Sequence, residues 1–262
     1  MIGMNNVNRF KENTKSFLLA IWIPSILIIL WAIGTNSGAL NNSIFPTPQK
    51  LFTNWKEMIL SGKYLNHVLS SFGRVFKGFF MGSLLGITLG TIIGLFAGAK
   101  KSTVALIGML RPIPAIALIP LFILSLGIGE TSKVAVITLG SFWPVLINTI
   151  AGLSATDAKL LEVGDIFDKT RREKLFKIIF PAAAPYIFTG LRLGVSSSWT
   201  CVVAAEMIAA SSGIGYLISY GREMAQPATL FIGVFSMGIF GLIIEIVVIN
   251  LQKKAIYWTP DR

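Results

Sequence analysis

The sequence predicts an all-α integral membrane protein with six transmembrane helices, and two observations support this. Of its 262 residues, 53% are hydrophobic and 13% are charged, with a mean hydropathy of +0.71, whereas soluble domains carry about 25% charged residues. The apolar residues also gather into runs of about 20, the length that a helix needs to cross a bilayer. The expected spans are residues 17–35, 78–99, 104–126, 134–153, 182–205 and 230–251.

The charge predicts how the chain lies in the membrane. A net charge of +11 in a membrane protein indicates basic cytoplasmic loops and anionic lipid rather than nucleic acid. With both termini in the cytoplasm, about twice as many Lys and Arg residues fall in inner segments as in outer ones. We therefore expect a cytoplasmic segment at residues 1–16 and a single transmembrane domain at 17–262. The first apolar run lacks a convincing cleavage site, which favours a retained span.

The outer segment and the second span differ in their patterns. Residues 49–60 and 64–76 have the apolar spacing of helices, and we expect them to lie along the outer membrane surface. In the second span a glycine recurs every fourth residue, which indicates a ridge that lets another helix backbone approach closely. These helix-packing glycines are Gly78, Gly82, Gly86, Gly90, Gly94 and Gly98.

The third span contains the run Arg111-Pro112-Ile113-Pro114 and a further proline, Pro120. Prolines at these positions predict a bent or broken helix, whose freed carbonyl groups must face protein or a water-filled path at membrane depth. We therefore count Arg111 among the candidate residues of a translocation path. A simple kink, with Arg111 extending to the lipid head groups, is the alternative.

The fifth span carries polar residues at membrane depth. Arg192 lies near mid-bilayer, where an isolated charge is costly, so it must be paired or hydrated. Glu245 of the last span reaches a similar depth, and an ion pair between them is one interpretation. The other is that Arg192 faces a translocation path and offsets the charge of an anion. Other candidates for that path are Ser196, Trp199, Thr200 and Glu206.

Residues 157–180 form a long polar interruption between two spans. Six Lys or Arg residues and four acids lie within 159–177, and apolar residues recur at helical spacing on both sides of Lys169-Thr170. This pattern predicts two short amphipathic helices, followed by re-entry into the bilayer at Pro181 and Pro185. Such helices either lie on lipid head groups or dock into a groove of a soluble partner.

This loop resembles the cytoplasmic loop of bacterial ABC-importer permeases, written E-A-A, three residues, G, nine residues, I-x-L-P. Glu162-Val163-Gly164 occupies the first triplet and Ile178-Ile179-Phe180-Pro181 closes it, but Asp168 stands where the glycine belongs. A glycine there tolerates left-handed backbone, which Asp adopts only at some cost. The stretches 111–130 and 180–218 resemble the permease group for sulfonates, taurine and nitrate or bicarbonate, and the resemblance extends over about 45–251.

The resemblance implies a type I ABC importer permease fold with cytoplasmic coupling helices in a bacterial inner membrane. The expected partners are a cytoplasmic ABC ATPase dimer, an extracytoplasmic substrate-binding protein, a second permease copy in a homodimer, and the lipid bilayer. The residues expected to couple to the ATPase are Glu162, Val163, Gly164, Ile166, Phe167, Asp168 and Pro181. The expected solute is a small anion, first an aliphatic sulfonate or taurine, then nitrate or bicarbonate, with a heterocyclic vitamin precursor as the alternative.

The sequence contains no pattern typical of an enzyme. One His and one Cys provide no triad, metal cluster or redox pair, and there is no Walker motif. We therefore expect no metal site and no cofactor in this chain, with ATP and Mg on the partner ATPase. A secondary transporter or channel is the rival class; it would need coupling carboxylates at mid-membrane and an internal repeat. Glu245 is a lone candidate carboxylate, and no repeat is visible.

Overall fold

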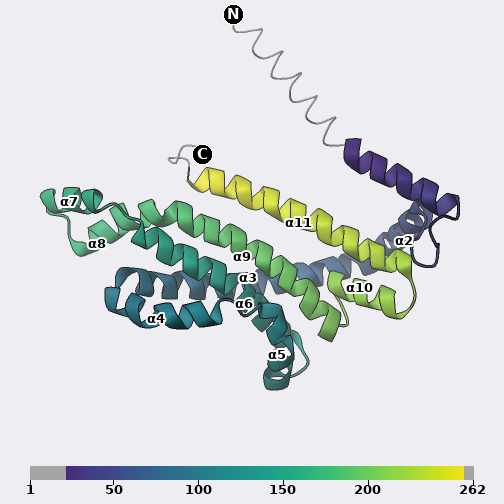
Figure 1. Cartoon of the computed structure of the whole chain (residues 1–262), viewed down its shortest axis with the longest axis horizontal. Coiled ribbons are helices and arrows are strands. Elements are labelled where there is room, and N and C mark those ends of the chain that lie inside the picture. The colour runs from purple at the N-terminus through teal and green to yellow at the C-terminus, as the bar shows by residue number, and fades with distance from the viewer. Residues whose placement is uncertain (1–21, 257–262) are drawn as a thin grey trace, which may run out of the picture.

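The computed structural model describes residues 22–256, which form an elongated bundle of helices without a strand (Figure 1). Long helices run side by side along the bundle, and shorter helices lie at its ends and along its side (Figure 1). In chain order the elements after the helix Trp22–Asn36 are α2 (Pro48–Leu60), α3 (Lys63–Leu95), α4 (Ala97–Leu110), η1 (Ala115–Leu118), α5 (Ile119–Leu126), α6 (Glu130–Ser154), α7 (Ala158–Ile166), α8 (Arg171–Lys174), η2 (Leu175–Ile179), α9 (Phe180–Ala209), α10 (Ile214–Glu223) and α11 (Pro227–Ala255).

Four of these helices are long and apolar enough to cross a membrane, and the pair formed by residues 98–110 and 115–126 makes a fifth candidate. They correspond to the second to sixth expected spans. The helix Trp22–Asn36 is apolar but shorter, and the beginning of the first expected span lies outside the described residues, as does the segment 1–16. The all-helical transmembrane fold is therefore confirmed, whereas the count of six spans stays a prediction.

α3 is one continuous helix of 33 residues. The expected separate surface helix at 64–76 is wrong, because this stretch forms the first part of α3. Its apolar spacing arises because one side packs into the bundle, where Val68, Ser71 and Val75 are buried. No proline lies between residue 64 and the second span, so nothing interrupts the helix.

Five glycines of the repeat in α3 lie against α6, which packs between α3 and α9. A Cβ added at Gly86 would lie 2.9 Å from Val145, and one added at Gly90 would lie 2.8 Å from Thr149. Gly78, Gly82 and Gly94 meet α6 in the same way. Gly98 does not belong to this ridge: it lies in α4, beyond the end of α3, and a Cβ there would meet nothing within 4 Å.

The third expected span is broken, as its prolines predict. α4 and the segment η1–α5 are bent by 79°, and α5 projects from the side of the bundle (Figure 1). The chain between them runs through Arg111-Pro112-Ile113-Pro114 before η1 begins. This break leaves irregular backbone beside α6.

The second of the two expected amphipathic helices is not a separate element. α8 continues through the π-helical turn η2 into α9, so residues 171–209 form one helix of 39 residues. The widened turn of η2 ends at Ile179, two residues before Pro181. Pro181 has no N–H, and its ring excludes the ordinary helical contact with the carbonyl group four residues earlier. Only α7 is a short separate helix in this loop.

Candidate functional site

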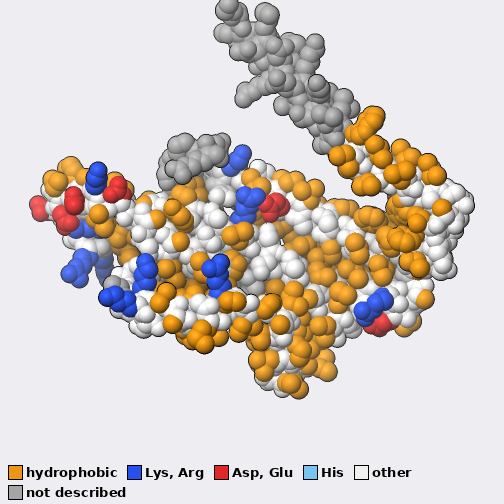
Figure 2. All heavy atoms as spheres, in the orientation of Figure 1, with side chains coloured by type: hydrophobic (Ala, Val, Ile, Leu, Met, Phe, Trp, Pro, Cys, Tyr) orange, Lys and Arg blue, Asp and Glu red, His pale blue; other side chains and the backbone are white. Residues whose placement is uncertain are grey.

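The bundle has two ends of different character (Figure 1). We call the end with α7, α8 and the last turns of α11 the α7 end, and the opposite end, with α2 and α10, the α10 end. Charged side chains gather over α7 and α8, whereas apolar side chains cover much of the middle (Figure 2). The residues expected to couple to a partner lie at the α7 end, whereas Glu206, one of those expected in a translocation path, lies at the α10 end.

α7 is held in place by local contacts. Asp157 caps its first turn by accepting a hydrogen bond from the Lys159 N–H at 2.9 Å. Gly164 is buried where α7 folds back, and a Cβ there would lie 2.9 Å from Ile178 in η2. Lys174 pairs with Asp165 across the same contact. The small residue at position 164 therefore lets α7 pack on the base of the 39-residue helix.

Asp168 ends α7 in left-handed backbone, with φ +48°. Its N–H donates to the Asp165 carbonyl at 3.0 Å, and the Lys169 N–H donates to the Gly164 carbonyl at 2.9 Å. These two bonds form a Schellman motif, in which a glycine is the usual left-handed residue. The position that departs from the permease loop pattern is thus the one where the backbone favours glycine. After it, Thr170 and Glu173 form a capping box that begins α8.

Several large apolar side chains of the loop point away from the bundle. Ile166 is 77% exposed, Phe167 69% and Phe176 67%, and Val163 and Leu160 are also exposed. Glu162 lies exposed among them, and within residues 22–256 no cation lies within ion-pair distance of it. Pro181 is half-buried where α9 begins. The arrangement is an acidic helix with an uncovered apolar surface.

At the α10 end the structure forms a partly buried ion cluster, which we define as Arg74, Glu206, Lys133 and the exposed Glu130. Arg74 donates to both carboxylate oxygens of Glu130, each at 2.7 Å, and to Glu206 at 2.7 Å. Lys133 also donates to Glu130, at 2.8 Å. Arg74, Glu206 and Lys133 are buried. The sequence analysis missed this cluster, because Arg74 and Lys133 lie outside the expected spans 78–99 and 134–153 and were counted with the outer segments.

Glu206 is completely enclosed rather than open to a path. The Ser71 hydroxyl donates to its carboxylate at 2.9 Å, as does the Gly215 N–H at the start of α10. The Ser71 hydroxyl also accepts the Ile214 N–H, and His67 Nδ1 accepts the Gly213 N–H at 3.1 Å. The cluster thus ties α3, α6, α9 and α10 together.

The four other path candidates that lie on α9 fall on different faces of this helix. Arg192 Nε donates to Glu245 at 2.9 Å, and Ser196 donates to the same carboxylate at 3.4 Å. Trp199 is buried in the apolar core and donates its indole N–H to the Met237 carbonyl. Thr200 is exposed and bonds only the Ser196 carbonyl of its own helix. The alternative of an Arg192–Glu245 ion pair is therefore the one that the structure shows.

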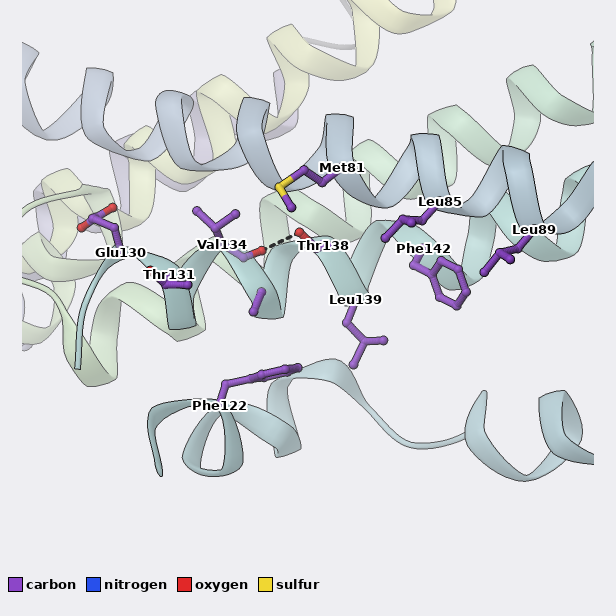
Figure 3. A pocket seen from close by; sticks show the side chains of 11 residues that line it. Met81, Leu85, Leu89, Phe122, Glu130, Thr131, Val134, Thr138, Leu139 and Phe142 are labelled. Carbon is purple, nitrogen blue, oxygen red and sulfur yellow. Dashed lines mark hydrogen bonds between the residues drawn. The ribbon is translucent and has the colours of Figure 1, made fainter. Parts of the chain in front are cut away.

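Several hollows lie beside α6, and two of them are the larger ones. One, of about 420 Å³, is lined by Arg111 at the break of the third span, by Trp143 and Asn148 of α6, and by Ser197 of α9, with apolar residues between them. The other, of about 660 Å³, lies between α3, α5 and α6 (Figure 3). Met81, Leu85 and Phe122 point into this second hollow, and Glu130 lies at its edge (Figure 3). Across residues 22–256, no group of three His, Cys, Asp or Glu residues could hold a metal ion.

Comparisons with known proteins identify the family. Residues 82–257 match the family described as binding-protein-dependent transport system inner membrane component. The putative aliphatic sulfonates transport permease protein SsuC of Bacillus subtilis is 36% identical over 256 residues, covering 95% of this chain and 91% of that protein. The taurine transport system permease protein TauC of Escherichia coli is 27% identical, covering 94% and 91%. The nitrate import permease protein NrtB of Synechocystis is 29% identical, covering 95% and 94%.

The solved structures show the same fold. The inward facing MetNI methionine ABC transporter superposes with a TM-score of 0.65 at 16% identity, covering 76% of this chain and 97% of that chain. The chain thus has the type I ABC importer permease fold, and its homologues are transport components in which ATP hydrolysis lies in a separate ATPase subunit. This multi-pass inner-membrane permease component belongs to the binding-protein-dependent transport system inner membrane component family, in its sulfonate, taurine and nitrate group.

Proposed function

We propose that this chain is the permease subunit of an ATP-driven ABC importer and forms the translocation path for a small anionic solute. An aliphatic sulfonate or taurine is the first choice, and nitrate or bicarbonate is the next. The similar permeases are named for aliphatic sulfonates, taurine and nitrate, which are small and carry an anionic group. The chain acts as a homodimer, receives its solute from an extracytoplasmic binding protein and binds a cytoplasmic ATPase dimer.

The exposed apolar surface of the 157–180 loop carries this proposal. Ile166, Phe167 and Phe176 are more than two-thirds exposed at the charged end of the bundle. Burying about four such side chains stabilises a complex by several kcal/mol before the costs of association. The match of Glu162, Ile178 and Pro181 to the coupling loop of ABC-importer permeases favours docking on a protein over lying on lipid head groups. A groove on a protein is the better match.

Charge supports the orientation in which the 157–180 loop and both termini face the cytoplasm. The count of outer cations includes Arg74 and Lys133, which are buried in ion pairs. Without these two, the excess of exposed Lys and Arg on the inner side is larger than the sequence alone indicates. This orientation brings α7 to the compartment that supplies ATP.

The continuity of residues 171–209 suggests how the motion of the ATPase reaches the membrane. Closure of the nucleotide-bound ATPases displaces α7, which packs on η2 through Gly164. Because α8, η2 and α9 form one helix, a tilt at the base of that helix moves its middle, where Ser197 lines the smaller hollow. The translocation path then opens alternately at the α7 end and at the α10 end.

The proposal is tested by a double substitution at the loop, Glu162→Lys with Phe167→Asp, measured by co-purification of the ATPase and by ATP-driven uptake in proteoliposomes. Loss of both is expected, because the change reverses a charge and places an acid on the docking surface. The matched control is Glu57→Lys with Phe52→Asp on α2, where both residues are exposed at the opposite end. The control should keep the ATPase. If the loop variant still captures the ATPase and drives uptake, the assignment fails.

The rival reading, a secondary transporter or channel, predicts uptake by the permease alone. Its candidate coupling carboxylate, Glu245, is engaged by Arg192, which leaves it poorly suited to bind a coupling ion. Solute uptake that persists without ATP and without any co-purified ATPase would favour the rival.

A further inference from the structure

We infer that the hollow of about 420 Å³ beside the break of the third span is a binding subsite for an alkanesulfonate, a solute with one anionic head, an apolar tail and no ammonium group. The inference rests on the proposed function and deepens it by naming the residues and the kind of anion. The hollow has the size of an ordinary small-molecule site.

The charge of the lining selects an anion. Arg111 is the only charged residue among the twelve that line the hollow, and no Asp or Glu is present there. Among the described residues, no carboxylate forms an ion pair with Arg111, in contrast to Arg74 and Arg192, which are both paired. A guanidinium group can donate two parallel hydrogen bonds to two oxygens of one sulfonate.

Neutral donors complete the polar side of the hollow. Trp143 and Asn148 come from α6, and Ser197 comes from α9. Asn148 uses one N–H on the Pro144 carbonyl at 2.8 Å, which leaves its second N–H for a ligand. The indole N–H of Trp143 is a donor only. Residues that carry donor groups therefore come to this small volume from three parts of the chain.

The apolar part of the lining favours a solute with a tail. Leu139, Ile147 and Leu193 line the same hollow. Nitrate and bicarbonate have no apolar group to place against these side chains. Taurine carries an ammonium group, and the lining contains no carboxylate to pair with it. An alkanesulfonate fits both parts of the lining, because its sulfonate suits the polar side and its tail suits the apolar side.

The break in the helix is what creates the site. The bend of 79° between α4 and the η1–α5 segment places Arg111, Ile113 and Pro114 together on the wall of the hollow. Irregular backbone at membrane depth is tolerated where it lines a cavity. The larger hollow in Figure 3 lacks these features, because its lining is almost entirely apolar and its only charged group is the carboxylate of Glu130.

The test measures direct binding of labelled hexanesulfonate, taurine and nitrate to the permease–ATPase complex without the binding protein, so that the partner's own selectivity does not contribute. Hexanesulfonate should bind at least about 10-fold more tightly than taurine or nitrate. Arg111→Gln should weaken hexanesulfonate binding by at least about 10-fold, the effect of losing a charge-assisted hydrogen bond. Arg111→Lys should retain part of the affinity.

Two further variants separate a binding role from a structural one. Lys101→Gln removes an exposed cation of α4 that does not line the hollow, and it should bind hexanesulfonate as the unmodified complex does. Ser197→Asp adds a carboxylate to the lining, so it should weaken hexanesulfonate binding and strengthen taurine binding. This switch does not require any variant of Arg111 to assemble.

The outcomes distinguish this inference from the proposed function. An assembled Arg111→Gln complex with unchanged hexanesulfonate affinity, or taurine binding as tight as hexanesulfonate binding, would overturn the subsite while leaving the importer assignment intact. A permease that captures no ATPase in any form would instead overturn the proposed function.

Discussion

The two ends of the bundle treat charged and apolar side chains in opposite ways. At the α10 end, Arg74 and Glu206 are buried and bonded to each other and to their neighbours. At the α7 end, Glu162 and Phe167 are exposed, and within residues 22–256 neither has a partner across the bundle. Buried charges that satisfy one another hold four helices together, whereas the exposed apolar groups around Glu162 are available to a partner. The first end is built for stability and the second for contact.

If this contrast is correct, the largest loss of stability should follow from Arg74→Met. The change leaves the Glu206 carboxylate buried without its cation, and breaking one side of a buried pair costs about 3–5 kcal/mol. Thermal unfolding of the purified permease in detergent measures the effect. Arg222→Met is the matched control, since the Arg222–Glu223 pair is 3.4 Å long with both side chains about 60% exposed, and should cost less than about 1 kcal/mol. Equal losses for the two variants would contradict the contrast.

A smaller loss is expected from Gly82→Ala in the middle of α3. The new Cβ would press against the Ser141 hydroxyl and the Thr138 carbonyl of α6, and overpacking of this kind costs about 1–3 kcal/mol. Gly73→Ala on the same helix is the control, because a Cβ there meets nothing within 4 Å. That variant should gain up to about 1 kcal/mol from helix propensity. Unfolding in detergent compares the two, and a stabilising Gly82→Ala would refute the close packing.

The features that sequence predicted well are those encoded by local patterns. The glycine repeat predicted close packing of the second span, and five of its six members meet α6. The prolines after Arg111 predicted the break in the third span. The departure from glycine at Asp168 marked a position that the structure places in left-handed backbone. Each of these inferences needed only the chemistry of neighbouring residues.

The features that sequence missed depend on residues far apart in the chain. Arg74 meets Glu206 across more than a hundred residues, and no local pattern indicates that partner. The sequence does contain a burial signal, because Arg74 and Ser71 lie on the helix face that carries Val68 and Val75. The same apolar spacing also fits a helix that lies on the membrane surface, which is the interpretation that proved wrong. The smaller hollow likewise brings together α4, α6 and α9. Side chains assigned to one path, such as Glu206 and Ser196, consequently fall into separate environments.

The two ends also share one feature, which allows a direct comparison. Asp168 at the end of α7 and Ala225 at the end of α10 are both left-handed, with φ +48° and +51°, and both belong to Schellman motifs. Substitution by Gly should stabilise each position by up to about 1 kcal/mol, more at Ala225 because Asp tolerates this conformation better. Hydrogen exchange of α7 and α10 measures the local gain. Asp168→Ala should loosen α7, and protection of α7 that is unchanged by either substitution would refute the strain.

The smallest effect on stability is expected at the most exposed part of the loop. Phe167→Ser should change the unfolding free energy of the isolated permease by less than about 0.5 kcal/mol, because the side chain is 69% exposed and supports nothing within the described bundle. The same variant should sharply reduce capture of the ATPase, measured by pull-down at matched expression. Arg74→Met should do the reverse, destabilising the permease while leaving the docking surface chemically unchanged. If the Phe167→Ser permease were clearly less stable to unfolding than the unmodified one, Phe167 would contribute to the stability of the fold. The division between a stable end and a contact end would then no longer hold.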